Sequence, residues 1–248
     1  MTDMPADTPR QNRLRHEIRR RNLTVTAAEH VTPSMLRLTL SGPELEGFPS
    51  ASPGDHIKMV VPDGAGGQAM RDYTPRRFDP RTNSLIIDFA LHDAGPATIW
   101  AVNARVGDPA QIAGPKGSNV IEGVENWLLI GDETALPSIG RRVEELAPGI
   151  PVTTLVAVPG PADEQQIATA ARHRALWVHR ADPTDGRDLQ RALAAIEIPP
   201  RTFVWIAAEA TVARALRDSV LGRGHPPAWT KAAGYWVAGQ ADASAKDL

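Results

Sequence analysis

Residues 127–137 read Trp127-Leu128-Leu129-Ile130-Gly131-Asp132-Glu133-Thr134-Ala135-Leu136-Pro137. The apolar run at the start predicts a short buried strand, and the proline at the end is typical of the first turn of a helix. The same order recurs toward the C-terminus, with strands predicted over 152–158, 176–179 and 203–207 and helices near 136–146, 165–172, 188–196 and 212–221. Such alternation predicts an α/β domain with a doubly wound parallel sheet over residues 123–248, ending in a short tail.

The preceding residues follow a different pattern, a succession of short strands. Apolar and β-branched residues alternate over 23–26 and 35–40, and similar runs cover 56–61, 70–74 and 84–92, with turns rich in proline, glycine or asparagine between them. One helix is expected from about Ala97 to Ala104, because Gly95-Pro96 resembles a helix start. This succession predicts an antiparallel β-barrel domain over residues 22–122.

Residues 1–21 carry six arginines and few apolar side chains. We expect a flexible basic arm that is solvated, with a polyanion-binding tail as the alternative.

Composition excludes several classes of protein. Of 248 residues, 42% are hydrophobic, and the net charge of −2 gives no field that would gather nucleic acid. The absence of cysteine excludes disulfides, thiolate metal sites and cysteine-ligated iron–sulfur clusters. No histidine pair has the spacing common in metal sites, so we expect no metal ligated by the protein. With no signal peptide and no run of roughly 18 apolar residues, we expect no membrane insertion and a cytoplasmic, monomeric protein.

The segment Arg71-Asp72-Tyr73-Thr74-Pro75-Arg76 offers the groups that a flavin site needs. On a strand, Arg71 and Tyr73 project to one face, which provides a cation for a pyrophosphate and an aromatic plane for the flavin ring. Thr74 offers a hydroxyl for a ring nitrogen. An ordinary edge strand with two arginines is the alternative. The helix start at Gly95, Ala97 and Thr98 supplies free N–H groups that suit an anion.

The segment Gly131–Pro137 ends the first predicted strand of the α/β domain, where nicotinamide cofactors lie in doubly wound sheets. Asp132 or Thr134 could equally serve as a helix cap. Three arginines near the third strand, Arg172, Arg174 and Arg180, are candidates for a 2′-phosphate and would favour NADPH. Solvated surface arginines are the alternative.

These segments, in this order, resemble the siderophore-interacting proteins, which are FAD-containing ferric-siderophore reductases. The resemblance covers about residues 20–240. Its landmarks include Arg20–Val25, Thr32–Leu40, Gly54–Lys58, Arg71–Arg76, His92–Ala101, Gly107-Asp108, Gly114–Ser118, Gly131–Pro137, Trp177–Arg180, Ala207–Glu209 and Gly234–Trp236.

The resemblance implies which residues bind the cofactors. It places Arg71 on the FAD phosphates, Tyr73 against the ring and Thr74 near the reactive nitrogen. Members of the family often have a basic residue after the pair Tyr235-Trp236, whereas this chain has Val237-Ala238. The full set implied for FAD and for NADPH or NADH is Arg71, Tyr73, Thr74, Arg76, His92, Gly95, Ala97, Thr98, Asp132, Glu133, Thr134, Ala135, Arg180, Glu209 and Trp236.

The implied activity is transfer of electrons from NAD(P)H through FAD to iron(III) held by a siderophore, with no acid or base residue assigned to catalysis. Candidates for contact with an anionic ferric siderophore are Lys58, Lys116 and Lys231. Two alternatives stay open: a siderophore-binding adaptor with little turnover, and a general NAD(P)H:flavin or ferredoxin-type reductase.

Overall fold

The computed structural model describes residues 8–92, 95–240, 243–245 and 248. Residues 13–120 form one compact unit, and residues 121–248 form a second with the described residues before Arg13. The boundary predicted between residues 122 and 123 lies two residues from this division. No described helix has both the length and the apolar character needed to cross a membrane.

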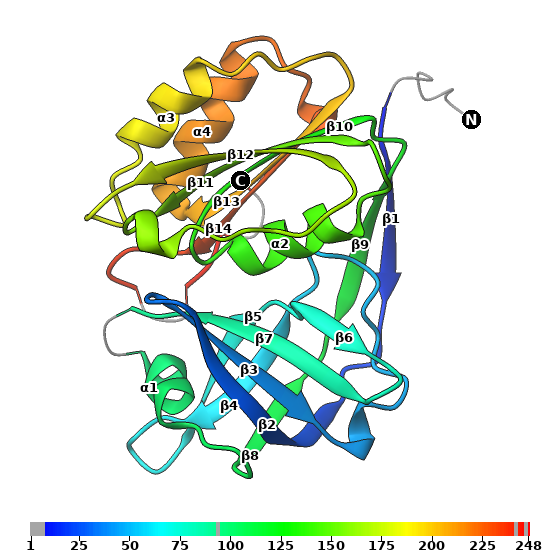
Figure 1. The fold of residues 1–248 in the computed structure, drawn as a ribbon, viewed down its shortest axis with the longest axis vertical. Helices are drawn as coiled ribbons and strands as arrows, with labels where there is room; N and C mark the ends of the chain where they lie inside the picture. The colour runs from blue at the N-terminus through cyan, green and yellow to red at the C-terminus, as the bar shows by residue number, and fades with distance from the viewer. Residues whose placement is uncertain (1–7, 93–94, 241–242, 246–247) are drawn as a thin grey trace. The chain divides into compact units, whose positions relative to one another are not determined.

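The first unit is an antiparallel β-barrel (Figure 1). Seven strands of its described residues form one sheet in the order β5-β4-β8-β2-β3-β7-β6, and each neighbouring pair is antiparallel. The helix α1 (Pro96–Asn103) packs against β4 and β5. The strands are β2 (Arg20–Thr32), β3 (Met35–Ser41), β4 (Ile57–Pro62), β5 (Gln68–Tyr73), β6 (Arg77–Asp79), β7 (Ser84–Ala90) and β8 (Pro109–Ala113).

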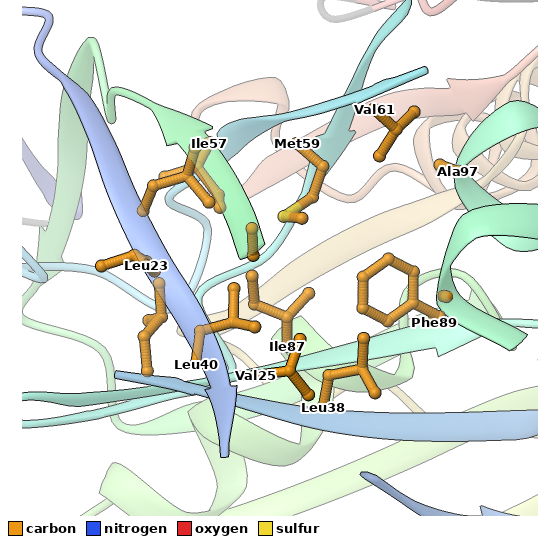
Figure 2. Packing of buried hydrophobic residues seen from close by; sticks show 14 of the residues in the cluster. Leu23, Val25, Leu38, Leu40, Ile57, Met59, Val61, Ile87, Phe89 and Ala97 are labelled. Atoms are coloured by element: carbon orange, nitrogen blue, oxygen red, sulfur yellow. The ribbon is translucent and has the colours of Figure 1, made fainter. Parts of the chain in front are cut away.

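The barrel encloses one apolar core, because alternate residues of each strand point inward. Figure 2 shows Ile57, Met59 and Val61 of β4 along one side of this core, with Phe89 of β7 facing them. In that view Ala97, at the start of α1, lies toward Val61. The core therefore orients both β4 and α1, the elements beside the predicted flavin segment.

The predicted arm over residues 1–21 contains more structure than expected. Strand β1 (Arg10–Arg15) pairs with β9 (Gly117–Glu122), and β2 already begins at Arg20. Arg21 is buried, and its guanidinium donates to the carbonyls of Gly114 (2.8 Å) and Glu44 (2.9 Å). Burial lowers the pKa of Arg21. The expectation of a solvated arm is therefore wrong for Arg21, because its partners come from distant loops.

The second unit is a three-layer α/β structure. Its described residues form a five-stranded parallel sheet in the order β12-β11-β10-β13-β14, with α2 on one face and α3 and α4 on the other (Figure 1). The elements are β10 (Asn126–Asp132), α2 (Leu136–Glu145), β11 (Pro151–Val158), β12 (Arg172–His179), α3 (Arg187–Ala194), β13 (Thr202–Glu209), α4 (Ala210–Gly222) and β14 (Thr230–Trp236).

The helix predicted near 165–172 is absent, although the structure describes all of these residues. A 3₁₀ turn at Pro161–Asp163 is followed by irregular chain until β12 begins at Arg172. Residues 164–171 are all exposed or half-buried, so they have no apolar stripe to pack on the sheet. Their polar groups bond locally: the Thr169 hydroxyl donates to the Val143 carbonyl, and Gly149 N–H donates to the Ala170 carbonyl.

Gly131 lets α2 approach β10 closely. A Cβ at this position would lie 2.6 Å from the Ala207 carbonyl oxygen and 2.7 Å from the Ala135 Cβ. Gly131→Ala is therefore expected to lower the free energy of unfolding by about 1–3 kcal/mol, because backbone must shift. Urea unfolding followed by circular dichroism measures the loss. Gly160→Ala is the matched control, since nothing lies within 4 Å there. An equal effect of both substitutions would contradict the packing argument.

Candidate functional site

The end of β5 carries the predicted flavin segment. Arg71 and Tyr73 pair with Met59 and Ile57 of β4, so both side chains share the face that points toward the core. The Tyr73 ring lies against Phe89, with ring centroids 4.4 Å apart. Burial raises the pKa of Tyr73, an effect that the charge of Arg71 opposes. Tyr73 is therefore a neutral, half-buried ring with a cation beside it on the same strand.

The next residues are buried. Thr74 is 7% exposed, and Arg76 is 8% exposed with its Nε 3.7 Å from the Asp88 carboxylate. Arg37 binds the same carboxylate through two bonds of 2.7 Å. The structure thus places Arg76 in an ion network inside the barrel, which supports a structural role. This network was not recognised in the sequence, where Arg37 and Asp88 stand 51 residues apart.

The start of α1 has the features of an anion site. No side chain among the described residues caps this helix, and Pro96 occupies its first position. Helix geometry leaves the Ala97 and Thr98 N–H groups without partners inside the helix. The Thr98 hydroxyl is buried. It makes no hydrogen bond of good geometry with the described residues, although it lies close enough to the Tyr73 hydroxyl to lower the pKa of that group. His92 lies close to this turn, because a Cβ on Gly95 would be 3.2 Å from its Cε1.

These residues fit FAD. Tyr73 lies opposite the first residue of β4 and Arg71 lies opposite the third, while Ala97 is near the fifth, Val61. The Tyr73 ring, the Arg71 cation and the free N–H groups at the start of α1 therefore follow one another along β4. An elongated dinucleotide needs its binding groups in such a row. The buried Thr98 hydroxyl and the free N–H groups of the first turn are suited to binding a polar ligand.

In the second unit the strand order reverses between β10 and β13, the usual place for a ligand in a doubly wound sheet. Asp132, at the end of β10, is 1% exposed and accepts four hydrogen bonds. Oδ1 accepts from the backbone and hydroxyl of Thr134. Oδ2 accepts from Glu209 N–H (3.0 Å) and from Trp236 Nε1 (2.9 Å). Asp132 thus connects the ends of three strands and does not cap α2.

Glu209 is the N-cap of α4. Its Oε2 accepts from the N–H groups of Thr211 (2.6 Å) and Val212 (3.1 Å), and its Oε1 accepts from Ala238 N–H (3.2 Å). This carboxylate therefore holds the backbone at Ala238, just after the aromatic pair. The structure gives Glu209 a structural task next to the expected nicotinamide site.

Glu133 and Arg180 form a partly buried ion pair at the same edge. Arg180 Nη2 lies 3.0 Å from Glu133 Oε2, and the Arg180 side chain is only 7% exposed. Burial raises the pKa of Glu133, as does the charge of Asp132, whereas Arg180 opposes both. Ala135 is fully buried at the α2 start.

The arginine cluster predicted for a 2′-phosphate does not form. Arg172 begins β12 and Arg180 follows its last residue, so about 23 Å of strand separates the ends that carry them. Arg172 also donates to the Gly149 carbonyl. Of the three arginines, only Arg180 lies at the carboxyl edge of the sheet. The prediction was wrong because it grouped the residues by their proximity in the sequence.

The three candidate lysines lie in different places. Lys58 of β4 pairs with Asp72 across the strand at 3.2 Å, on the face opposite Arg71 and Tyr73. Lys116 is exposed and follows the end of β8, beside the start of β4. Lys231 is near the amino end of β14, five residues and about 16 Å of strand before Trp236. Lys231 is therefore close to the aromatic pair in the sequence but lies toward the other end of the same strand.

Tyr235 is fixed by contacts that the sequence did not reveal. Its hydroxyl lies 3.2 Å from Ser138 Oγ of α2, and its ring stands edge-on to Trp205 at 6.0 Å. Together with the bond from Trp236 to Asp132, these contacts hold the aromatic pair at the carboxyl end of the sheet.

Comparison with known proteins extends over nearly the whole chain. Residues 124–239 match the family model of siderophore-interacting proteins, and residues 24–70 and 65–119 match the siderophore-interacting FAD-binding domain. The NADPH-dependent ferric-chelate reductase of Escherichia coli is 33% identical, over 94% of this chain and 99% of that protein. The ferric vibriobactin reductase of Vibrio cholerae is 28% identical over 72% of this chain and 73% of its own length.

Solved structures give the same result. A siderophore utilization protein from T. fusca superposes with a TM-score of 0.89 at 32% identity, over 94% of this chain and 98% of that one. Phthalate dioxygenase reductase, at 17% identity and a TM-score of 0.66 over 90% of this chain and 70% of that one, shares the fold. The barrel with its FAD segment, the doubly wound sheet and the full-length matches together show that this chain belongs to the siderophore-interacting protein family.

Proposed function

We propose that the protein is an FAD-dependent ferric-siderophore reductase that uses NADPH or NADH. The observation that carries the proposal is the placement of the candidate residues in the two units. Arg71 and Tyr73 share one face of β5 in the barrel, and Asp132 ends β10 where the strand order of the parallel sheet reverses. The similarity to a ferric-chelate reductase over 94% of the chain supports the choice of acceptor.

The chemistry that FAD supplies when bound is the conversion of a two-electron hydride donor into single electrons, which iron(III) needs. The side chains supply binding and orientation. Arg71 and the N–H groups of Ala97 and Thr98 would bind the phosphates, and Tyr73 would offer an apolar plane to the ring. Asp132 fixes the Trp236 ring at the edge where the nicotinamide is expected. Reduction weakens the hold of hard oxygen donors on iron, so electron transfer releases the metal.

The two alternatives make different predictions. An adaptor would bind ferric siderophore without oxidising the donor, and a general flavin reductase would reduce free flavin or a protein acceptor at least as fast as a ferric chelate. The deciding experiment measures NADPH and NADH oxidation by the FAD-loaded protein with and without ferric siderophore, with a ferrous-specific chelator as readout. Absence of ferrous iron with either donor would refute the proposal.

The acceptor is proposed to be an anionic ferric siderophore bound near Lys58 and Lys116. Both lysines lie where β4 begins and β8 ends, and Tyr73 ends β5 beside the same residues. Exposed charges attract an anion over roughly 10 Å at 0.1 M salt, so the interaction steers binding more than it accelerates transfer.

Lys116→Ala is therefore expected to raise KM for an anionic ferric siderophore by about threefold to tenfold, with kcat nearly unchanged. Steady-state reduction at increasing salt measures this, and the wild-type rate at low substrate is expected to fall as salt rises. Lys58→Ala has the same direction but a smaller effect, because Asp72 already neutralises that lysine. Lys231→Ala is the comparison at the opposite end of its sheet. Salt-independent rates and unchanged KM in Lys116→Ala would remove the lysine from the pocket.

Two further properties belong to the proposal: action in the cytoplasm and a monomeric state. Cell fractionation tests the first, and light scattering coupled to size-exclusion chromatography tests the second.

A further inference from the structure

Arg180 is a cation in an unusual position. It follows β12 at the carboxyl edge of the sheet, the edge where a dinucleotide is expected. Its Nη2 lies 3.0 Å from Glu133 Oε2 and 3.9 Å from Asp132 Oδ2. An arginine at this edge is well suited to a bidentate contact with the 2′-phosphate that distinguishes NADPH from NADH. Here two carboxylates of another strand already hold it.

The other basic side chains described at or after the end of β12 also have carboxylate partners. His179 Nε2 lies 2.8 Å from Glu164, and Arg187 lies 2.6 Å from Asp185. Both of these pairs are more exposed than the pair of Arg180 with Glu133. A 2′-phosphate bound beside the end of β12 would therefore draw an arginine away from an existing carboxylate partner.

From this competition we propose that Glu133 is a positioning residue that sets the donor preference, because it holds Arg180 and thereby reduces the advantage of NADPH over NADH. The inference rests on the proposed function, since it concerns the nicotinamide donor of the same reaction. When Arg180 turns to a 2′-phosphate, the Glu133 carboxylate stays buried without its partner. NADH requires no such exchange, so the wild-type protein discriminates weakly between the two donors.

The surroundings of Glu133 make the loss of its Arg180 partner unfavourable. Its side chain is 16% exposed, and burial raises the pKa of the carboxyl, as does the neighbouring charge of Asp132. Asp132 itself is engaged by four donors and is not able to turn away. The ion pair with Arg180 opposes both effects and lowers the pKa of Glu133, and a bond from the backbone N–H of Glu133 acts in the same direction.

The test compares binding of adenosine 2′,5′-bisphosphate and of AMP to the FAD-loaded protein by titration calorimetry, because these ligands differ only in the 2′-phosphate. Glu133→Gln is expected to tighten binding of the bisphosphate by about tenfold and to leave AMP within about twofold. Arg180→Ala is expected to abolish the preference for the bisphosphate. Glu164→Gln, which removes a carboxylate from the His179 pair at the same edge, is the matched control.

A double-mutant cycle separates a specific effect from a general gain in positive charge. If Glu133 acts through Arg180, Glu133→Gln has little effect in the Arg180→Ala background. An equal gain for both ligands, an equal gain in that background, or bisphosphate binding that survives Arg180→Ala would overturn the proposal. Glu133→Asp, which retracts the carboxylate, should show the same direction if Glu133→Gln does not fold. Ferric-siderophore reduction is assayed separately, so its failure would not be confused with failure of the binding test.

Discussion

Replacing Arg71 and Tyr73 together by alanine is expected to give a folded protein that purifies without flavin. Arg71 is the cation on the face of β5 that points toward the barrel core, and Tyr73 is the aromatic plane two residues later. A charge-assisted phosphate contact contributes about 1.5–3 kcal/mol, and an aromatic stacking contact about 0.5–1.5 kcal/mol. Loss of both corresponds to a rise of roughly 100-fold in the Kd for FAD.

Flavin absorbance per protein and fluorescence titration of the refolded protein with FAD measure this loss. The matched control is Lys58→Ala, since Lys58 belongs to the paired strand but lies on the opposite face. Tyr73→Phe keeps the ring against Phe89 and is expected to keep most of the affinity. If the double variant binds FAD as tightly as the wild type while circular dichroism shows it folded, β5 is not the flavin strand.

Local patterns in the sequence were sufficient for most of the architecture. Alternation along β4 and β5 predicts which side chains share a face, and this places Arg71 with Tyr73. The apolar run before Asp132 predicts the first strand of the parallel sheet, and Pro137 predicts the start of α2. These features are short-range, because strand and helix periods depend on neighbouring residues.

The partners of the site residues were not predictable in this way. Asp132 bonds to Glu209 and Trp236, which are 77 and 104 residues away. Glu133 and Arg180 are 47 residues apart in the sequence. Their ion pair gives a carboxylate partner to an arginine that we had predicted to contact a phosphate. Register between parallel strands decides such contacts, and only the folded sheet fixes the register.

The crossover between β11 and β12 differs from the prediction, because it contains no α-helix. Alternation of strands alone favours a helix there, but residues 164–171 offer no apolar face, and hydrogen bonds such as that from Thr169 to the Val143 carbonyl hold the chain instead. The parallel sheet still forms, since β12 pairs with β11 along all eight residues. The carboxyl edge is thus built by strand order and does not depend on every helix.

Asp132 is expected to be the most sensitive residue of that edge. Its two oxygens receive four donors, two from Thr134, one from Glu209 and one from Trp236. Asp132→Asn keeps the shape but replaces one acceptor oxygen by an NH₂ group, which faces donors in either orientation. The N–H of either Thr134 or Glu209 then loses its partner, and we expect the free energy of unfolding to fall by about 2–4 kcal/mol.

Urea unfolding followed by circular dichroism measures the change, and binding of AMP reports whether the nucleotide edge is kept. Trp236→Phe is the matched comparison, because it removes a single donor and leaves the backbone bonds of Asp132 intact, so about 1 kcal/mol is expected. Because Asp132 connects the ends of three strands, its substitution is expected to lower the free energy of unfolding more than substitution of any one of its partners. If Asp132→Asn costs no more than Trp236→Phe, the four bonds do not act together, and the nicotinamide edge is held by packing of α2 and α4 instead.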